Sequence, residues 1–168
     1  MRVEPFSVVS LDPAHDRSLF KSGSDPLDLY FRERVTQDVR RRVTACFVAL
    51  SREGRLAGFY TLASASVLLG DLPEKYTKTL PRYPSVPAVR MGRLAVDETF
   101  KGQGLGGALL ADAFIRAFRS DIAAYALVVD AKDDVAANFY RHHGFVELGS
   151  EPLTLFLPLA TAPVSKTR

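Results

Sequence analysis

The stretch Arg93-Leu-Ala-Val-Asp-Glu-Thr-Phe-Lys-Gly-Gln-Gly-Leu-Gly-Gly-Ala-Leu-Leu110 decides how the rest of the chain is interpreted. It begins as an apolar strand, passes through a short polar loop, and ends in a glycine-rich turn that leads into a helix. Glycines let backbone N–H groups point at a ligand without interference from a Cβ, and the N-terminus of a helix adds a positive partial charge. The segment therefore predicts a cradle for a phosphate or pyrophosphate, to which Lys101 adds a positive charge.

The sequence of this turn narrows the class of ligand. It lacks the Gly-Lys-Ser or Gly-Lys-Thr ending of a loop that binds nucleoside triphosphates. Gly102, Gly104 and Gly107 satisfy the spacing G-x-G-x-x-G of dinucleotide sites. However, the preceding strand lies in mid-chain, and the acid at Asp130 comes too late to bind a ribose. A turn that only starts a helix remains the alternative to a phosphate cradle.

The size and composition of the chain are those of a globular domain. Its 168 residues are 47% hydrophobic and 24% charged, and a domain of this size buries about 70% of its unfolded surface without help from a metal or disulfide. We expect one domain over residues 1–159 and a frayed tail over residues 160–168. The single cysteine, Cys46, excludes a disulfide framework and a cysteine-based zinc site. With no secretory signal and no apolar run near the roughly 20 residues that span a bilayer, we expect a cytoplasmic protein without a membrane partner.

Helix and strand patterns alternate along the chain. Asp25 and Pro26 are typical of an N-cap followed by proline at the first helical position. This order predicts an α/β (α+β) fold with helices packed on one mixed sheet. Strands are expected over residues 2–10, 43–50, 56–65, 88–96, 124–129, 145–148 and 153–159, and helices over 25–39, after Pro73, over 104–118 and over 133–142.

Two motifs resemble those of one superfamily. Lys101-Gly-Gln-Gly-Leu-Gly106 is similar to the [Q/R]-x-x-G-x-G/A pyrophosphate loop of the GNAT N-acetyltransferases, which bind acetyl-CoA, with lysine where glutamine or arginine is usual. Ala136-Ala-Asn-Phe-Tyr-Arg-His-His-Gly-Phe145 is similar to their late A-x-x-F-Y-x-x-x-G-F segment. The resemblance implies the GNAT fold, a mixed and mostly antiparallel central sheet with a splayed strand pair, flanked by helices. It also implies acetyl-CoA as cosubstrate and no metal.

The resemblance assigns roles to individual residues. The strand before the loop is expected to bind the pantetheine arm through its backbone, with one N–H near the thioester oxygen. Tyr140 is the expected general acid, because a phenol with a pKa of ~10 is protonated at neutral pH and can donate to the departing sulfur. A purely packing role for Tyr140 and Phe139 is the alternative. The expected cofactor-binding residues are Leu94, Ala95, Val96, Lys101, Gly102, Gln103, Gly104, Leu105, Gly106, Gly107 and Asn138.

A narrower resemblance covers most of the chain. Residues 20–30, 37–47 and 92–97 are similar to the GNAT toxins of bacterial toxin–antitoxin pairs. This resemblance implies acetylation of the α-amino group of aminoacyl-tRNA, which blocks translation, together with a homodimer and a ribbon-helix-helix antitoxin as partner. An acetyltransferase of a small-molecule amine or of a protein N-terminus is the alternative. A third hypothesis is an acetyl-CoA-binding regulatory module without catalysis.

Charge is unevenly distributed along the chain. The 22 lysines and arginines exceed the 19 aspartates and glutamates by only +3, which does not by itself indicate a nucleic-acid binder. Arginines gather between Arg32 and Arg55, where a solvated face, tRNA phosphates and an acidic antitoxin tail are each compatible with the pattern. Arg90 and Arg93 lie next to the expected cofactor strand and are candidates for guiding the acceptor stem.

The remaining candidates have structural interpretations. Cys46 lies in an apolar strand and is expected to pack in the core. Asp130, Asp133 and Asp134 are expected to cap the last helix rather than to form an acid pair. No general base stands out, and an α-amino group with a pKa near 8 has a usable neutral fraction without one. The missing base therefore slightly favours an α-amine as acceptor.

Overall fold

A computed structural model describes residues 5–161, and the chain clusters into two compact units. The first unit comprises Met1–Ala63 and Gly92–Ala113, and the second Ser64–Met91 and Phe114–Arg168. The start of the expected first strand and the tail beyond residue 161 lie outside the described residues. The single domain expected over residues 1–159 stays a prediction. Between residues 5 and 161, no helix is both long and apolar enough to cross a membrane.

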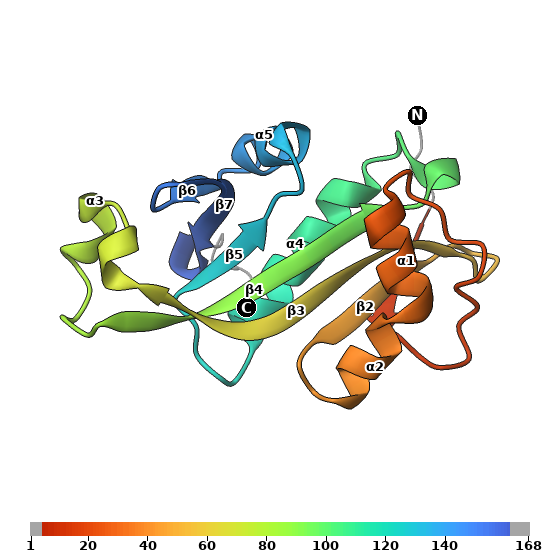
Figure 1. Ribbon diagram of the computed structural model, residues 1–168, viewed down its shortest axis with the longest axis horizontal. Coiled ribbons are helices and arrows are strands. Elements are labelled where there is room, and N and C mark those ends of the chain that lie inside the picture. The colour runs from red at the N-terminus through yellow and green to blue at the C-terminus, as the bar shows by residue number, and fades with distance from the viewer. Residues whose placement is uncertain (1–4, 162–168) are drawn as a thin grey trace. The chain divides into compact units, whose positions relative to one another are not determined.

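Within residues 5–161, seven strands form a mixed sheet in the order β1-β2-β3-β4-β5-β7-β6 (Figure 1). The pairings β1–β2, β2–β3, β5–β7 and β6–β7 are antiparallel, whereas β4 and β5 run parallel. The expected mixed and mostly antiparallel sheet is thereby confirmed. The strands are β1 (Ser7–Ser10), β2 (Ala45–Leu50), β3 (Leu56–Leu68), β4 (Ser85–Val96), β5 (Ala126–Asp130), β6 (Val146–Leu148) and β7 (Glu151–Pro158).

The helices follow the sequence pattern, except that the helix expected over residues 25–39 is divided. Arg34 interrupts it with φ −124° and ψ −27°, and its N–H donates to the Tyr30 carbonyl, which closes the first of the two helices. The short helix expected after Pro73 is confirmed. The α-helices of the described residues are α1 (Asp25–Glu33), α2 (Val35–Arg40), α3 (Glu74–Thr77), α4 (Leu105–Arg119) and α5 (Asp134–His142).

The start of α1 differs by one residue from the prediction. Ser24, not Asp25, is the N-cap, with extended backbone and a side-chain oxygen that accepts from the N–H of Leu27 at 3.5 Å. Asp25 and Pro26 therefore take the first two helical positions. Both serine and aspartate are good N-caps, so residue type alone did not decide between the two neighbours.

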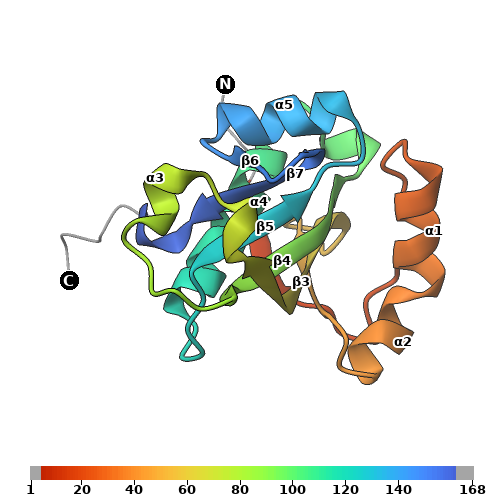
Figure 2. The same ribbon diagram turned by 60° about the vertical axis from the view of Figure 1, so that its left-hand side comes forward.

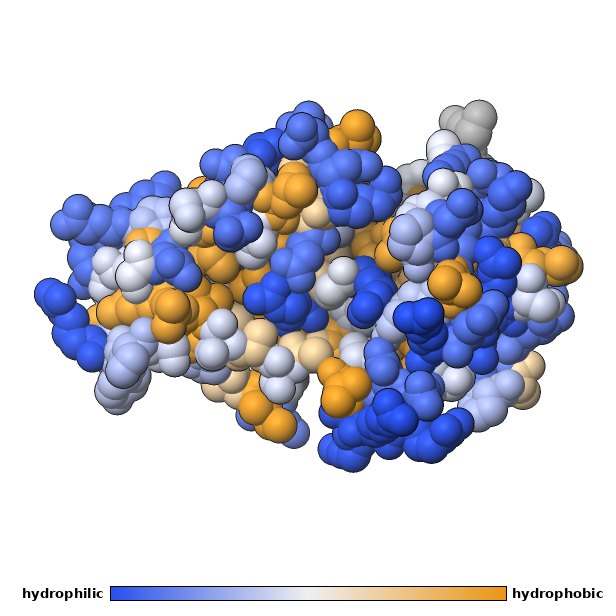
Figure 3. Space-filling view, viewed as in Figure 1, coloured by the Kyte–Doolittle hydropathy of each residue, from blue (hydrophilic) through white to orange (hydrophobic). Residues whose placement is uncertain are grey.

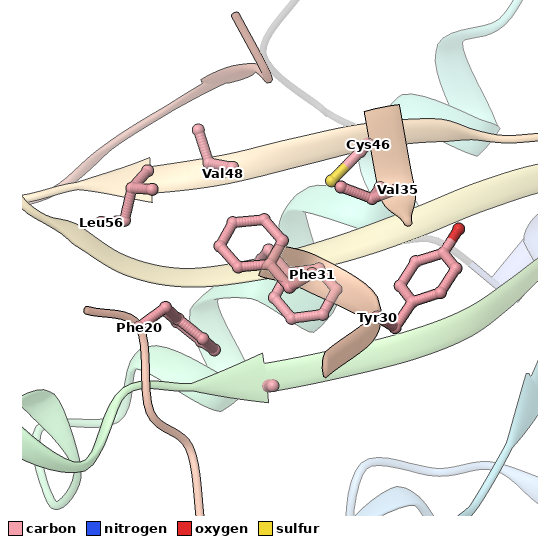
Figure 4. Packing of buried hydrophobic residues seen from close by; sticks show 9 residues of the cluster. Phe20, Tyr30, Phe31, Val35, Cys46, Val48 and Leu56 are labelled. Carbon is pink, nitrogen blue, oxygen red and sulfur yellow. The ribbon is translucent and has the colours of Figure 1, made fainter. Parts of the chain in front are cut away.

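In the first unit, alternate residues of β3 face helices on opposite sides. The Phe59 ring stacks on that of Phe31 in α1, with centroids 4.2 Å apart, and meets Phe20 edge-on, in the cluster that Figure 4 shows. Gly58 and Tyr60 point the other way, where the Tyr60 hydroxyl donates to Asp112 of α4. Helices α1 and α2 thus lie on one side of this part of the sheet and α4 on the other (Figure 2).

In the second unit, β5 is covered on both faces. All four residues of its apolar run are buried, as a central strand requires: Ala126, Leu127, Val128 and Val129.

Helix α5 begins after its N-cap Asp133, whose carboxylate accepts from a backbone N–H of the first turn at 2.8 Å. The expected cap by Asp133 is confirmed.

An alanine at position 58 tests the close approach of β3 and α4. A Cβ on Gly58 would lie 2.8 Å from Leu109 Cδ1 and 2.9 Å from the carbonyl oxygen of Ala95. The leucine methyl can rotate, but the carbonyl is backbone, so the strands must move apart. We expect Gly58→Ala to lower the free energy of unfolding by about 1–3 kcal/mol in a urea titration.

Gly70→Ala is the matched control, because a Cβ there meets nothing within 4 Å among the described residues. Its unfolding free energy should change by less than about 0.5 kcal/mol. Equal losses in the two variants would contradict the packing explanation.

Candidate active site

The glycine-rich turn has the backbone geometry that a phosphate cradle needs. Gly102 and Gly104 have φ angles of +84° and +79°, in the left-handed region that favours glycine. Among the described residues, nothing lies within 4 Å of a Cβ built at either position, so the conformation rather than crowding requires glycine and the space is open to a ligand. Helix α4 starts at Leu105, and the N–H of Ala108 donates to the Gly104 carbonyl at 3.1 Å. The three preceding N–H groups are those that a bound pyrophosphate would meet.

Lys101, the expected positive charge, is bonded to the segment that precedes α1. Its Nζ donates to the carbonyl oxygen of Ser22 at 2.6 Å. Nearby, the Asp97 carboxylate accepts from the N–H of Lys21 at 3.0 Å and from the N–H of Thr99 at 2.9 Å. These bonds tie the segment before α1 to the turn before α4, and they place the Lys101 ammonium group at the carbonyl of Ser22.

The strand residues expected along the cofactor form the end of β4. Ala95 is buried in the core of the first unit, whereas Leu94 and Val96 are half-buried. The parallel register of β4 with β5 covers Ala88 to Met91, and the last residues of β4 continue beyond it. Strand residues beyond a pairing keep backbone N–H and C=O groups for another partner. The end of β4 can therefore pack in the core through its side chains and also bind a cofactor through its backbone.

Arg93 is held against α1 by an aromatic ring. Its Cζ lies 3.5 Å from the centroid of the Tyr30 ring, a cation–π contact. The Tyr30 hydroxyl donates to Asp38 Oδ2 at 2.7 Å. Burial, and next this bond, raise the pKa of Tyr30, so the phenol keeps its proton and its role as donor. The guanidinium of Arg93 thus has a fixed place beside the first helix.

Tyr140, the expected general acid, is buried in the second unit. It is 4% exposed, and its ring centroid lies 5.3 Å from that of Phe139 and 5.7 Å from that of Phe145. Burial, and next the negative charge of Asp130, raise the pKa of Tyr140 above that of a free phenol. A raised pKa favours the neutral form of a phenol, so the hydroxyl keeps its proton at neutral and mildly alkaline pH.

Arg90 and Asp130 bind each other in the same unit. Arg90 Nη1 lies 2.7 Å from both carboxylate oxygens of Asp130, and Thr154 Oγ1 lies 3.4 Å from one of them. The prediction that Asp130 caps the last helix was wrong, because this residue ends β5 and its side chain reaches across to β4. Arg90, expected to guide the acceptor, is a member of an ion pair.

Two further predicted residues have clear surroundings. Asn138 is exposed on α5, and its side-chain oxygen accepts from Arg141 Nη1 at 2.7 Å. Cys46 is confirmed in the core, where burial raises the pKa of its thiol to about 12. Within residues 5–161, no three His, Cys, Asp or Glu side chains gather into a group that could hold a metal ion.

Sequence reasoning missed the partners of the two site arginines. Tyr30 lies in α1 and Asp38 in α2, eight residues apart in the sequence. In one continuous helix, side chains at this spacing do not meet, so the helix expected over residues 25–39 did not indicate their contact. Arg90 did carry a signal, because a charged residue inside an apolar strand has to reach either solvent or a group of opposite charge. Finding Asp130 as that partner requires the parallel register, which pairs Arg90 with Val128.

The comparisons with known proteins define the class. Residues 10–145 match the family described as Acetyltransferase (GNAT) family. The chain belongs to this family, which confirms the resemblance of the two motifs. It is an N-acetyltransferase, and acetyl-CoA is its cosubstrate.

Individual relatives are more specific. The chain is 38% identical over 154 residues to the tRNA-acetylating toxin of Mycobacterium tuberculosis, with 90% of this chain and 91% of the relative covered. It is 33% identical over 162 residues to the probable toxin TacT of Sinorhizobium fredii, with 90% of each covered. Its structure is similar to that of AtaT complexed with acetyl-methionyl-tRNAfMet, with TM-score 0.86, 27% identity and coverage of 93% and 96%. AtaTR bound with AcCoA gives TM-score 0.80, 26% identity and coverage of 92% and 94%.

An alanine at position 104 tests whether the left-handed turn serves cofactor binding. We expect Gly104→Ala to cost about 1–2 kcal/mol of stability, because its Cβ opposes a φ of +79°. Relief of that strain would rotate the N–H groups at the start of α4, so calorimetric titration should show weaker binding of acetyl-CoA. Gly54→Ala is the matched control, with φ +82° and, among the described residues, nothing within 4 Å of its Cβ. It should lose similar stability and keep its affinity; equal affinities in both variants would refute a role of the turn.

Proposed function

We propose that this protein is a toxin that transfers the acetyl group of acetyl-CoA to the α-amino group of aminoacyl-tRNA and thereby blocks translation. The observation that carries the proposal is the 38% identity, over 154 residues, to a protein named tRNA-acetylating toxin. The similarity in fold to AtaT, solved with acetyl-methionyl-tRNAfMet, supports the same class of substrate. Since translation takes place in the cytoplasm, the protein would act there.

The glycine-rich turn is the proposed site for the pyrophosphate of acetyl-CoA. Its two left-handed glycines and the backbone N–H groups in the first turn of α4 suit an anion. The proposed contacts along the pantetheine arm are backbone groups of β4, one N–H of which would polarise the thioester carbonyl. The proposed cofactor-binding residues are those expected from the sequence: Leu94, Ala95, Val96, Lys101, Gly102, Gln103, Gly104, Leu105, Gly106, Gly107 and Asn138.

Tyr140 is the proposed general acid. In the transfer, the amine nitrogen forms a bond to the carbonyl carbon and the carbon–sulfur bond breaks. The Tyr140 hydroxyl gives its proton to the departing sulfur, and the proton that the amine loses returns to the phenol through solvent. The burial that raises the pKa of Tyr140 supports this role, because it keeps the acid in its protonated form.

The acceptor proposed here explains why a general base is not needed. An α-amino group has a pKa of about 8, against about 10.4 for a lysine side chain, so a usable fraction is neutral at physiological pH. Attachment of the amino acid to tRNA as an ester lowers this value further, because the ester withdraws electrons from the amine.

Exposed arginines at the end of α2 are a proposed contact for tRNA phosphates. Arg40, Arg41 and Arg42 are all exposed, and none of them forms an ion pair with another described residue. Figure 3 shows hydrophilic side chains gathered over α2. Arg40 also lines a hollow of about 360 Å³ beside α2. Neighbouring exposed guanidinium groups at the end of one helix suit a phosphate backbone, whose neutralisation releases counterions.

Two further partners belong to the proposal. The resemblance to GNAT toxins implies that the protein forms a homodimer and that a ribbon-helix-helix antitoxin binds and neutralises it. Size-exclusion chromatography with light scattering would measure the first. Copurification with the product of a small neighbouring gene would test the second.

Replacement of Tyr140 by phenylalanine tests the function. The variant keeps the ring and its packing, so we expect unchanged binding of acetyl-CoA. With the proton donor removed, acetylation of charged tRNA should fall by about a hundredfold or more, measured with labelled acetyl-CoA. Tyr125→Phe, which removes a hydroxyl from a half-buried tyrosine of the same unit, is the control and should keep full activity.

Each outcome of this assay selects one function. Acetylation of charged tRNA by the unmodified protein supports the proposal, whereas turnover only with free amines indicates a small-molecule or N-terminal acetyltransferase. Binding of acetyl-CoA without any turnover indicates a regulatory module. Equal turnover in Tyr140→Phe would remove the assigned role of Tyr140.

Charge reversal on α2 tests the tRNA contact. We expect Arg40→Glu with Arg41→Glu to raise KM for charged tRNA at least about tenfold and to weaken its dependence on salt, because each lost phosphate contact lowers the slope by about 0.7–0.9. Acetyl-CoA binding should not change. Arg42 is left in place because its φ of +61° is already unusual for a residue with a Cβ.

The control reverses the same number of charges on α3, with Lys75→Glu and Lys78→Glu, and should leave KM for tRNA within about twofold of its original value. A similar rise in both double variants would show a general effect of net charge instead of a local contact.

A further inference from the structure

The segment that precedes α1 is held by a buried carboxylate of that helix. Asp28 is 1% exposed, and its Oδ1 accepts from the hydroxyl of Ser22 at 2.6 Å and from the N–H of Ser22 at 3.0 Å. Its Oδ2 accepts from the same N–H at 3.1 Å. Ser22 is also buried, so both oxygens of the carboxylate bind one residue in the interior of the first unit.

The helix itself does not account for this carboxylate. The N-cap of α1 is Ser24, and Asp28 lies four residues after it. The ion pair of Asp28 with Arg32 is long, at 3.9 Å, and the arginine side chain is 39% exposed. A carboxylate removed from water is costly unless hydrogen bonds compensate for the lost hydration. Here the short hydrogen bonds come from Ser22, which lies outside the helix.

The same segment holds, through its carbonyl groups, the residues that lead into the glycine-rich turn. The carbonyl oxygen of Ser22 accepts from Nζ of Lys101 at 2.6 Å. The carbonyl oxygen of Lys21 accepts from the N–H of Glu98 at 2.8 Å. Lys101 directly precedes Gly102, whose left-handed backbone belongs to the turn. A chain of contacts therefore runs from the carboxylate of α1 through Ser22 to the side chain of Lys101.

We propose that Asp28 is a positioning residue for acetyl-CoA, which fixes Ser22 so that its carbonyl holds the ammonium group of Lys101 ready for the pyrophosphate. Asp28 acts through the other two residues, because its own side chain is buried against Ser22. The inference rests on the proposed function in one respect, namely that Lys101 and the glycine-rich turn bind the pyrophosphate.

A lysine that is held before the ligand arrives binds an anion more tightly for a physical reason. An exposed lysine side chain has many rotamers, and an anion that fixes it must offset the lost freedom. Lys101 is exposed, but its bond to Ser22 already limits this freedom in the folded protein. An ammonium group has three N–H donors, so one bond to a carbonyl leaves two for an anion.

Asp28→Asn tests the proposal in the full chain. The amide has nearly the size of the carboxylate, but one acceptor oxygen becomes an NH₂ donor, which opposes the donors of Ser22. We expect the affinity for acetyl-CoA, measured by calorimetric titration, to fall about fivefold to tenfold. An affinity within about twofold of that of the unmodified protein would overturn the proposal.

Lys101→Met decides whether the effect of Asp28 passes through the lysine. This variant should itself bind acetyl-CoA about tenfold more weakly. In a double-mutant cycle, Asp28→Asn added to Lys101→Met should lower the affinity by less than a further twofold or so, because the last member of the chain of contacts is already gone. A full additional loss would show that Asp28 acts by another route and would overturn the proposal.

Ser24→Ala is the matched control for the stability of α1. It removes the hydroxyl that caps the same helix and leaves Asp28, Ser22 and Lys101 in place. Its thermal midpoint should fall by a few degrees, while its affinity for acetyl-CoA should stay within about twofold of the original. Equal losses of affinity in Ser24→Ala and Asp28→Asn would show an effect of helix stability alone and would overturn the positioning role.

Ser22→Ala keeps the test decisive if Asp28→Asn fails to fold. It removes only the hydroxyl that donates to Asp28 at 2.6 Å and keeps the carbonyl that binds Lys101. We expect about threefold weaker binding of acetyl-CoA in Ser22→Ala, and no further weakening when the same change is made in Lys101→Met. Unchanged affinity in Ser22→Ala, or an equal loss in both backgrounds, would overturn the proposal.

The titration also separates this inference from the proposed function, because it needs no acceptor amine. Binding that depends on Asp28 as expected, in a protein that does not acetylate charged tRNA, would support the positioning role and refute the proposed substrate. Unchanged binding in both Lys101→Met and Gly104→Ala would refute the proposed pyrophosphate site and with it the positioning role. Weaker binding in these two variants with unchanged binding in Asp28→Asn would refute the positioning role alone.

Discussion

The close approach of β3 and α4 at Gly58 is the constraint on which the proposed cofactor site of the first unit depends. A side chain at this position would displace the carbonyl of Ala95, a residue of the strand expected along the cofactor. The same contact holds Leu109, one turn into α4, and Leu105, with which α4 begins. The N-terminus of α4 is therefore fixed on the sheet, and the glycine-rich turn before Leu105 ends at this fixed point. The direction of its N–H groups follows from packing in the core.

The parts of the fold that depend on local sequence were predictable, and those that depend on tertiary contacts were not. The order of strands and helices, the glycine-rich turn and the cap at Asp133 depend on residues close together in the sequence, and pattern and propensity describe such residues well. The break at Arg34 and the cap at Ser24 were missed, because each was a choice between neighbouring residues of similar propensity. Local propensity does not decide such a choice.

The sequence indicated which residues belong to the candidate site, but not which residues they contact. Arg90 and Arg93 were both candidates for guiding the acceptor stem, because they lie near the expected cofactor strand. In the structure Arg93 lies on the ring of Tyr30 and Arg90 on the carboxylate of Asp130. These partners come from distant parts of the chain, and only the register of the sheet and the packing of α1 bring them together. The guanidinium is the same group in both places. Its neighbours decide whether it packs on an aromatic ring or forms an ion pair with a carboxylate.

In the proposed mechanism, acetyl transfer needs two groups that are neutral at the same pH, the acceptor amine and the phenol of Tyr140. The amine becomes neutral as the pH rises past about 8, while the phenol must remain protonated. Burial raises the pKa of Tyr140, which extends the range of pH in which both conditions hold. The same shift has a cost, because a phenol that holds its proton more firmly gives it less readily to a thiolate whose own pKa is near 8.5. The negative charge of Asp130 raises the pKa of Tyr140 in the same direction as burial, so it adds to this cost.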